Sequence, residues 1–164
     1  GREKPLVFEI VSFEQNSHFF IHVPENLASF LEGQIGAQYP KVLISAAPDP
    51  LPQRISGKHV AFGNLFLSGP AYLPLKTWRD FTDADPLSSI LGTMAKVEKE
   101  EVILLQIVVL PAGNWQATGA RALSAGITEA DGTKKAHPKS GLIEKRISQN
   151  VLRAGIRLLV ASES

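Results

Sequence analysis

Hydrophobic and polar residues near the start of the chain follow the pattern of a β-hairpin. Leu6–Glu14 and His18–Val23 are rich in Phe, Ile and Val, which favour strands. Between them, Gln15–Ser17 are polar residues that suit a turn. Pro24 follows the second segment and ends it. The pattern therefore predicts two antiparallel strands joined by a short turn.

The next segment, Glu25–Gln38, has the spacing of an amphipathic helix. Its large apolar residues recur at offsets of three and four and share one stripe: Leu27, Phe30, Leu31 and Ile35. Tyr39 and Pro40 end the helix, because the residue before a proline disfavours the helical conformation. We expect the stripe to pack on a sheet, so that Phe30→Ala would destabilise the fold by about 3 to 5 kcal/mol. Lys41–Ala46 is predicted to be a short strand.

A similar order of elements is predicted from residue 60 onward. Val60–Ser68 and Ala71–Thr77 have the composition of strands. Asp85 and Pro86 favour a helix start, since Asp accepts free amides and Pro fits the first helical position. The apolar stripe of that helix comprises Leu87, Ile90, Leu91 and Met94. Glu101–Leu110 is almost continuously apolar, which predicts a strand at the centre of the sheet.

Strand, strand, helix, strand is thus predicted twice, over residues 6–46 and 60–112, with a Pro-rich loop between the two halves. A C-terminal extension, 113–164, follows. Its predicted elements are a helix over Trp115–Ser124, a polar loop over Gly126–Gly141, a helix over Leu142–Gln149 and a final alternating strand, Leu152–Val160. Hairpins mixed with helices favour an α+β fold: one domain, 1–164, with a mixed, largely antiparallel sheet and helices mainly on one face.

Composition narrows the possible chemistry. The chain has 164 residues, 44% of them hydrophobic and 20% charged, and a formal net charge of +1. It can therefore bury a core, and it has no global attraction to nucleic acid or anionic lipid. The absence of cysteine excludes disulfides, thiolate zinc sites and cysteine nucleophiles. The longest apolar run, Val102–Ala112, is far shorter than the roughly 20 residues of a spanning helix, so no membrane span is expected in this chain.

Candidate phosphate and metal ligands have simpler structural interpretations. Ser56–His59 lacks the upstream glycine of a phosphate-binding loop and runs into a predicted strand. His18 and His22 lie four positions apart on a predicted strand, which separates their backbones by about 13 Å, too far for one metal ion. We therefore assign no catalytic residue, cofactor or metal ligand from these patterns.

Three aspartates precede or start the second predicted helix: Asp80, Asp83 and Asp85. The glycine and the terminal glutamate of a calcium-binding EF-hand loop are missing around them, so a solvated turn and a helix cap are the favoured interpretation. An alternative stays open. Asp80, Asp83 or His59 could serve a small ligand-binding domain or enzyme whose site lies in the cleft between the two repeats.

Charge is distributed unevenly along the chain. Residues 1–100 carry nine basic and eleven acidic side chains, whereas residues 101–164 carry eight and five. Most of the basic excess comes from Lys134, Lys135, Lys139, Lys145 and Arg146. This basic cluster is either a solvated loop or a contact for a phosphate backbone or an acidic partner. Few aromatic residues interleave with it, so any nucleic-acid binding is expected to be weak and independent of sequence.

Several short stretches occur in an order typical of a known family. They are Phe8–Phe13, His18–Pro24, Phe30–Pro40, Asp85–Ile90, the strand containing Gln106 with Pro111 and Trp115 beyond it, and Ile156–Leu159. Together they resemble the N-terminal, non-ATPase region of the TraG-like motor ATPases of bacterial type IV secretion and conjugation, which are related to the HerA and FtsK motors. The resemblance covers residues from about 7 to 160.

The resemblance implies an accessory domain excised from a longer ATPase. In such proteins this region follows one or more membrane helices and precedes a RecA-like motor. Since this chain has no Walker A motif, ATP hydrolysis is not carried over to any of its residues. The implied location is the cytoplasm, at the inner face of the membrane. The implied partners are other subunits of the secretion or conjugation machine or copies of the parent motor, and the implied role is assembly, channel docking or delivery of substrate or DNA.

Overall fold

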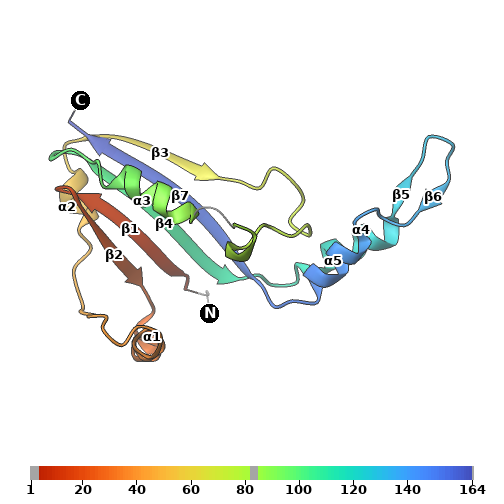
Figure 1. The fold of residues 1–164 in the computed structure, drawn as a ribbon, viewed down its shortest axis with the longest axis horizontal. Coiled ribbons are helices and arrows are strands. Elements are labelled where there is room, and N and C mark those ends of the chain that lie inside the picture. Colours follow the sequence, from red (N-terminus) through yellow and green to blue (C-terminus); the bar gives the residue numbers. More distant parts are fainter. Residues whose placement is uncertain (1–3, 82–84, 164) are drawn as a thin grey trace. The chain divides into compact units, whose positions relative to one another are not determined.

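The structure, a computed structural model, describes residues 4–81 and 85–163 and has an α+β fold, as the sequence predicts. Its main feature is a five-stranded antiparallel sheet with the strand order β2-β1-β4-β7-β3 (Figure 1). These strands are β1 (Leu6–Phe13), β2 (Asn16–His22), β3 (His59–Leu65), β4 (Val102–Pro111) and β7 (Leu152–Ser162). A separate small hairpin pairs β5 (Ile127–Thr128) with β6 (Lys134–Lys135).

In the described part of the chain, five α-helices and one 3-10 helix accompany the strands. They are α1 (Glu25–Gln38), α2 (Leu51–Ile55), α3 (Pro86–Met94), α4 (Gln116–Ala125), α5 (Ser140–Ile147) and the 3-10 helix η1 (Trp78–Asp80). The chain divides into two compact units. Unit 1 comprises Gly1–Leu65, Leu87–Leu110 and Ala154–Ser164 and holds the five-stranded sheet. Unit 2 comprises Phe66–Pro86 and Pro111–Arg153 and holds α4, α5 and the small hairpin.

The N-terminal hairpin is confirmed, with a turn that differs from the predicted one. Glu14 and Gln15 connect the strands and have φ angles of 50° and 61°. Phe13 pairs directly with Asn16 across this turn. A two-residue turn with positive φ at both positions matches the twist of the flanking strands, which offsets the strain of that conformation at non-glycine residues. β2 therefore begins at Asn16, and the predicted turn over Gln15–Ser17 was placed too late.

β4 lies at the centre of the sheet, as its apolar sequence predicts. It pairs with β1 so that Val11 stands opposite Leu104 and Phe13 opposite Val102. These four residues and Ala161 of β7 form a buried core cluster. The core of unit 1 is thus built across β1, β4 and β7 from residues far apart in the chain.

α2 was not predicted, because its region contains three prolines and was interpreted as a loop. The structure shows why a helix forms there. Pro50 precedes the helix and Pro52 lies in its first turn, where helical amides have no intrahelical acceptor to lose. The Leu51 amide donates to Asp49 Oδ1 over 3.0 Å, which satisfies one of these amides. Leu51 and Ile55 then pack against the core cluster.

The two predicted strand-strand-helix-strand repeats are wrong in detail. Neither Lys41–Ala46 nor Ala71–Thr77 forms a strand. Prolines 40 and 48 flank the first segment, and prolines 70 and 74 precede and interrupt the second; a proline cannot donate to a strand ladder. A single sheet replaces the repeats, and its last strand in the sequence, β7, lies between β4 and β3.

α1 has the predicted bounds but not the predicted packing. None of its residues is buried, and the Phe30 side chain is 67% exposed. Only Val23 and Pro24 separate α1 from the edge strand β2, and α1 lies beside the end of that strand (Figure 1). The core cluster on the sheet is packed instead by Leu51 and Ile55 of α2. The prediction that the α1 stripe packs on a sheet is therefore wrong.

Candidate functional site

The sheet face that carries the core cluster also carries a row of polar residues. Side chains two positions apart in a strand share a face, so Glu9 lies on the same face as Val11 and Phe13 of β1. Its direct partner on β4 is Gln106. The apolar face therefore changes to polar at the Glu9 and Gln106 pair.

Glu9 is enclosed and hydrogen-bonded on both carboxylate oxygens. Its side chain is only 2% exposed. Oε2 lies 2.8 Å from His22 Nε2 of β2, and Oε1 accepts a 2.6 Å hydrogen bond from the Gln106 amide. The Gln106 carbonyl oxygen in turn accepts a longer, 3.4 Å contact from Arg157 of β7. The polar row, His22, Glu9, Gln106 and Arg157, thus crosses four adjacent strands.

The polar row can fix the register of the sheet. A slip of one residue between β1 and β4 would move the Glu9 carboxylate to the opposite face and break its bond with Gln106. A buried carboxylate without hydrogen bonds is strongly unfavourable, so this slip is disfavoured. Sequence reasoning missed Glu9. A charged residue inside a strand of Phe, Ile and Val is a signal, but only the register shows that Gln106 is its partner.

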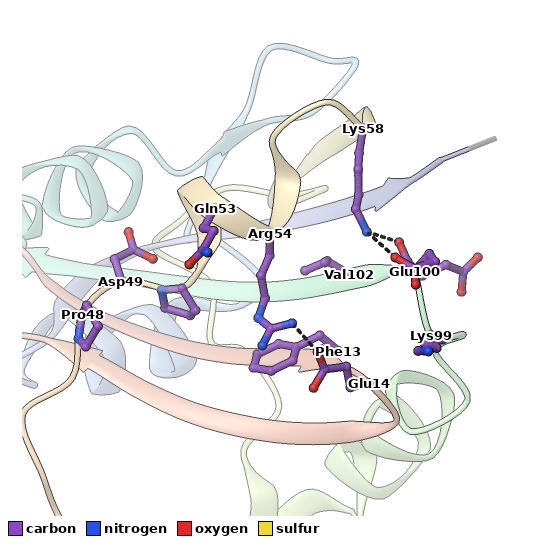
Figure 2. Close-up of a pocket in the computed structure, with 12 residues that line it drawn as sticks. Phe13, Glu14, Pro48, Asp49, Gln53, Arg54, Lys58, Lys99, Glu100 and Val102 are labelled. Carbon is purple, nitrogen blue, oxygen red and sulfur yellow. Dashed lines mark hydrogen bonds and ion pairs between the residues drawn. The ribbon is translucent and has the colours of Figure 1, made fainter.

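A cavity of about 570 Å³ lies beside α2 in unit 1 (Figure 2). Its walls come from the end of β1, the segment around α2 and the segment that leads into β4. The Arg54 guanidinium lies 3.5 Å from the centre of the Phe13 ring and donates to Glu14 Oε1 over 3.0 Å. On the other side, the Lys58 ammonium donates to the Glu100 carbonyl oxygen and lies 3.9 Å from its carboxylate.

Two cations in the lining of this cavity form ion pairs with carboxylates. Arg54 is paired with Glu14, and Lys58 with Glu100, while Asp49 accepts the Leu51 amide at the start of α2. The Arg54 side chain bridges α2 and the β1–β2 turn, so it also holds the wall together. The cavity therefore combines a stacked guanidinium with a lining of both charge signs, three basic and four acidic residues. It presents no electrostatic surface of a single sign to a ligand.

The basic cluster predicted from the sequence lies in unit 2. Lys134 and Lys135 form β6, Lys139 directly precedes α5, and Lys145 and Arg146 lie in the last turn of α5. The predicted polar loop over 126–141 is therefore wrong in part, because it contains the small β5–β6 hairpin and the start of α5. The hairpin forms because the residues at its tip are hydrogen-bonded to one another.

Two glycines permit the close packing of α4 against the β5–β6 hairpin and against α5. Gly126 ends α4 with a φ of 60°, and a Cβ atom there would lie 2.2 Å from the Lys135 carbonyl oxygen. Only glycine permits both that conformation and that close approach. Gly119 is buried, and a Cβ atom there would meet Ile147 of α5 at 2.4 Å. α4 and α5 therefore pack closely, and the hairpin lies against the end of α4.

Only part of the basic cluster is free for a partner. Lys135 makes a 2.8 Å ion pair with Glu129. Arg146 lies 5.5 Å from the centre of the Trp115 ring, and its Nε is enclosed. The remaining members are exposed and have no acidic partner within 4 Å among the described residues: Lys134, Lys139 and Lys145. The cluster thus offers three free ammonium groups.

An acidic residue at the hairpin tip weakens the positive field there. Asp131 accepts the Thr133 backbone N–H over 2.9 Å, and this bond to the backbone lowers the pKa of the Asp131 carboxyl below its usual value. Asp131 therefore stays ionised near neutral pH, a few residues from Lys134. Its hydrogen bond stabilises the turn, and its negative charge offsets the positive charge of one lysine.

The other sequence candidates have structural roles or belong to different units. His18 stacks on Phe13 with ring centres 4.3 Å apart. Asp80 accepts hydrogen bonds from the Thr77 backbone N–H (2.6 Å) and hydroxyl (2.8 Å), which lower its pKa. His59 begins β3 in unit 1, whereas Asp80 belongs to unit 2. Asp83 lies outside the described residues. The described part of the chain holds no group of three or more metal-ligating side chains.

The chain belongs to the family described as Domain of unknown function (DUF8128), whose model matches residues 3–164. No curated protein and no solved structure matches it. Across residues 4–81 and 85–163, no helix is long and apolar enough to cross a membrane.

Proposed function

From the sequence resemblance, we propose that the chain is a non-catalytic accessory domain of a bacterial type IV secretion or conjugation motor ATPase. It acts through protein contacts, serves assembly, channel docking or delivery of substrate, and works at the cytoplasmic face of the membrane through its parent protein. The single observation that supports a contact function best is the exposure of α1.

α1 buries little of its surface within this chain. It has 14 residues, yet none of them is buried. Helices of that length are marginal in water by themselves, and most of their stability in proteins comes from packing of an apolar stripe. The stripe includes Leu27 (40% exposed) and Phe30 (67% exposed), with Tyr39 (67% exposed) just beyond the helix. The exposed stripe is therefore a surface that a second protein could cover.

Substitution of Phe30 in the full parent protein tests this proposal. Phe30→Asp places a charge in the exposed stripe, so we expect loss of motor assembly and of DNA or protein transfer while the circular dichroism of the 164-residue chain stays unchanged. Ser29→Asp is the matched control, because Ser29 is exposed on the opposite face of the same helix and the charge change is equal. Equal transfer by both variants and the unaltered protein would contradict the proposal.

The gene provides a second, independent test. The proposal predicts that the reading frame continues beyond Ser164 into a Walker A strand and helix within the next few hundred codons. A stop codon directly after this domain would refute the assignment to a motor ATPase.

The three free lysines of the basic cluster support an additional, weak contact with DNA. Lys134, Lys139 and Lys145 are exposed, and non-specific binding arises from release of counterions by such groups. We expect a dissociation constant no tighter than about 10⁻⁴ to 10⁻⁶ M that weakens steeply with salt. Titration of single- and double-stranded DNA at two salt concentrations, with a triple Lys→Gln variant as control, measures this. Tight, salt-insensitive binding would contradict the electrostatic account.

A further inference from the structure

β3 is an edge strand with one unoccupied side. β7 pairs with one side of it, and within residues 4–81 and 85–163 no strand pairs with the other (Figure 1). All seven residues of β3 are exposed. The apolar ones include Phe62 (80% exposed), Leu65 (56%) and Val60 (43%). An edge strand therefore combines free backbone groups with uncovered apolar side chains.

This edge lacks the features that usually prevent edge-to-edge pairing. Protective devices are charged side chains, prolines, bulges and very short strands. β3 spans His59–Leu65 without a charged residue other than a histidine, without proline, and pairs residue for residue with β7. A Cβ atom built on Gly63 would meet nothing within 4 Å, so nothing covers the sheet face at the middle of this strand.

We propose that β3 pairs antiparallel with β3 of a second copy of this chain, about a two-fold axis at Phe62. Phe62 is the middle residue of the strand, so the axis places Phe62 opposite its own copy. Val60 then faces Asn64 of the second copy, and Ala61 faces Gly63. None of these pairs brings two like charges together, which is the condition that an isologous strand contact must meet.

The backbone geometry fits this pairing in either case. Residues of an antiparallel edge strand alternately point their N–H and C=O groups outward. If the backbone N–H and C=O groups of Phe62 point outward, the two copies of Phe62 form a hydrogen-bonded pair. If those of its neighbours point outward, Ala61 of one copy forms backbone hydrogen bonds with Gly63 of the other. The two Phe62 side chains then face each other at closer range. The contact joins two five-stranded sheets into one continuous antiparallel sheet.

A second copy fits better than a charged peptide. β3 has no lysine, arginine or acidic residue with which to select a ligand of either sign, whereas an identical uncharged strand satisfies its backbone groups and covers Phe62. One strand pair is smaller than a standard interface of about 1,600 Å², so we expect a weak dimer. This inference goes beyond the proposed function and holds whether or not the parent is a secretion motor.

Sedimentation equilibrium of the 164-residue chain over a concentration series tests the pairing. We expect a monomer–dimer equilibrium, and Phe62→Lys should raise the dimer Kd by about tenfold or more, because it places like charges opposite each other. The matched control is Phe19→Lys, which changes another largely exposed phenylalanine on the other edge strand, β2 (69% exposed), and should leave the Kd unchanged. Circular dichroism confirms that both variants fold.

A cross-linking experiment locates the contact directly. The chain has no cysteine, so Phe62→Cys introduces a unique thiol at the two-fold axis. Residues directly opposite in an antiparallel pair have Cα atoms about 4.5 to 5.5 Å apart, within the range of a disulfide. Mild oxidation should therefore give a disulfide-linked dimer with Phe62→Cys and little with Phe19→Cys. A monomer up to the solubility limit, an equal Kd change in the two Lys variants, or equal cross-linking of the two Cys variants would overturn the proposal.

Discussion

The centre of the sheet and its outer elements have similar apolar sequences but very different surroundings. Val11 of β1 and Val102 of β4 are 0% and 2% exposed, whereas Phe30 of α1 and Phe62 of β3 are 67% and 80% exposed. β4 has a strand on each side, and the core cluster to which it contributes is also packed by α2; among the described residues, β3 has a strand on one side only. Apolar side chains are therefore buried at the centre of the sheet and exposed at its periphery.

The polar row shows that the difference between centre and periphery does not follow from residue polarity alone. Glu9 is a charged residue in the buried centre, and Phe30 is an aromatic residue on the surface. Each breaks the simple rule that apolar residues lie inside. Glu9 is tolerated because His22 and Gln106 bond both of its oxygens. Phe30 has no comparable compensation inside unit 1, which is why we assign it to a partner.

Removing a core side chain should lower the free energy of unfolding more than a change in the polar row or in α1. Leu104 is 5% exposed in the core cluster, so Leu104→Ala should lower the free energy of unfolding by about 2 to 5 kcal/mol. Urea denaturation of the purified chain measures this, and Phe62→Ala at a low chain concentration serves as the peripheral control, with an expected change below about 1 kcal/mol. Equal losses in the two variants would remove the distinction between centre and periphery.

Breaking the polar row should lower the free energy of unfolding by an intermediate amount. Gln106→Leu removes the amide that donates to Glu9, and leaving a buried acceptor short of a donor costs about 1 to 3 kcal/mol. The double variant Glu9→Leu with Gln106→Leu should recover part of that stability, since replacing both partners leaves no unsatisfied group between them. If the double variant is no more stable than Gln106→Leu alone, the bond between the two side chains is not what stabilises this pair.

Truncating the exposed helix should have a small effect. The sequence alone suggests that Phe30→Ala lowers the free energy of unfolding by about 3 to 5 kcal/mol, which is the cost for a buried ring. With the ring 67% exposed, we expect less than about 1 kcal/mol in the same urea titration. A loss near that of Leu104→Ala would show that the α1 stripe is covered within this chain.

The smallest effect concerns a surface turn in unit 2. Hydrogen bonds from the Thr77 backbone N–H and hydroxyl lower the pKa of Asp80 in the folded state. The resulting stabilisation is present above the unfolded pKa of about 3.9 and is lost as pH falls through the lower folded pKa. An NMR titration should show the Asp80 carboxyl titrating below that of a reference peptide, and Thr77→Ala should move it partly back. An unshifted titration would show that the turn is open in solution.

The sequence predicts the elements that depend on local pattern. The α+β class, the N-terminal hairpin, the bounds of α1 and the central place of β4 all follow from periodicity, from turn residues and from the long apolar run of β4. α4 also forms within one residue of its predicted bounds. In the hairpin and in β4 the local preference and the tertiary environment agree, whereas in α1 only the bounds of the helix follow the local pattern.

Features set by long-range pairing could not be predicted. The insertion of β7 between β4 and β3 joins segments far apart in the chain, and no local pattern encodes it. The same holds for Glu9, because its partner Gln106 is separated from it by 97 positions. The α1 stripe has the spacing of a buried face, yet spacing does not tell whether the covering surface belongs to the same chain.

Site-specific photo-cross-linking in the full parent protein tests the central claim that the outer elements contact other proteins. A photoreactive phenylalanine analogue replaces Phe30, and in a second strain it replaces Ser29, which is exposed on the opposite face of the same helix. We predict that position 30 cross-links in cells to another subunit of the secretion or conjugation machine, identified by mass spectrometry, far more strongly than position 29. Cross-links from position 30 confined to its own chain would contradict it, because the stripe would then be covered from within.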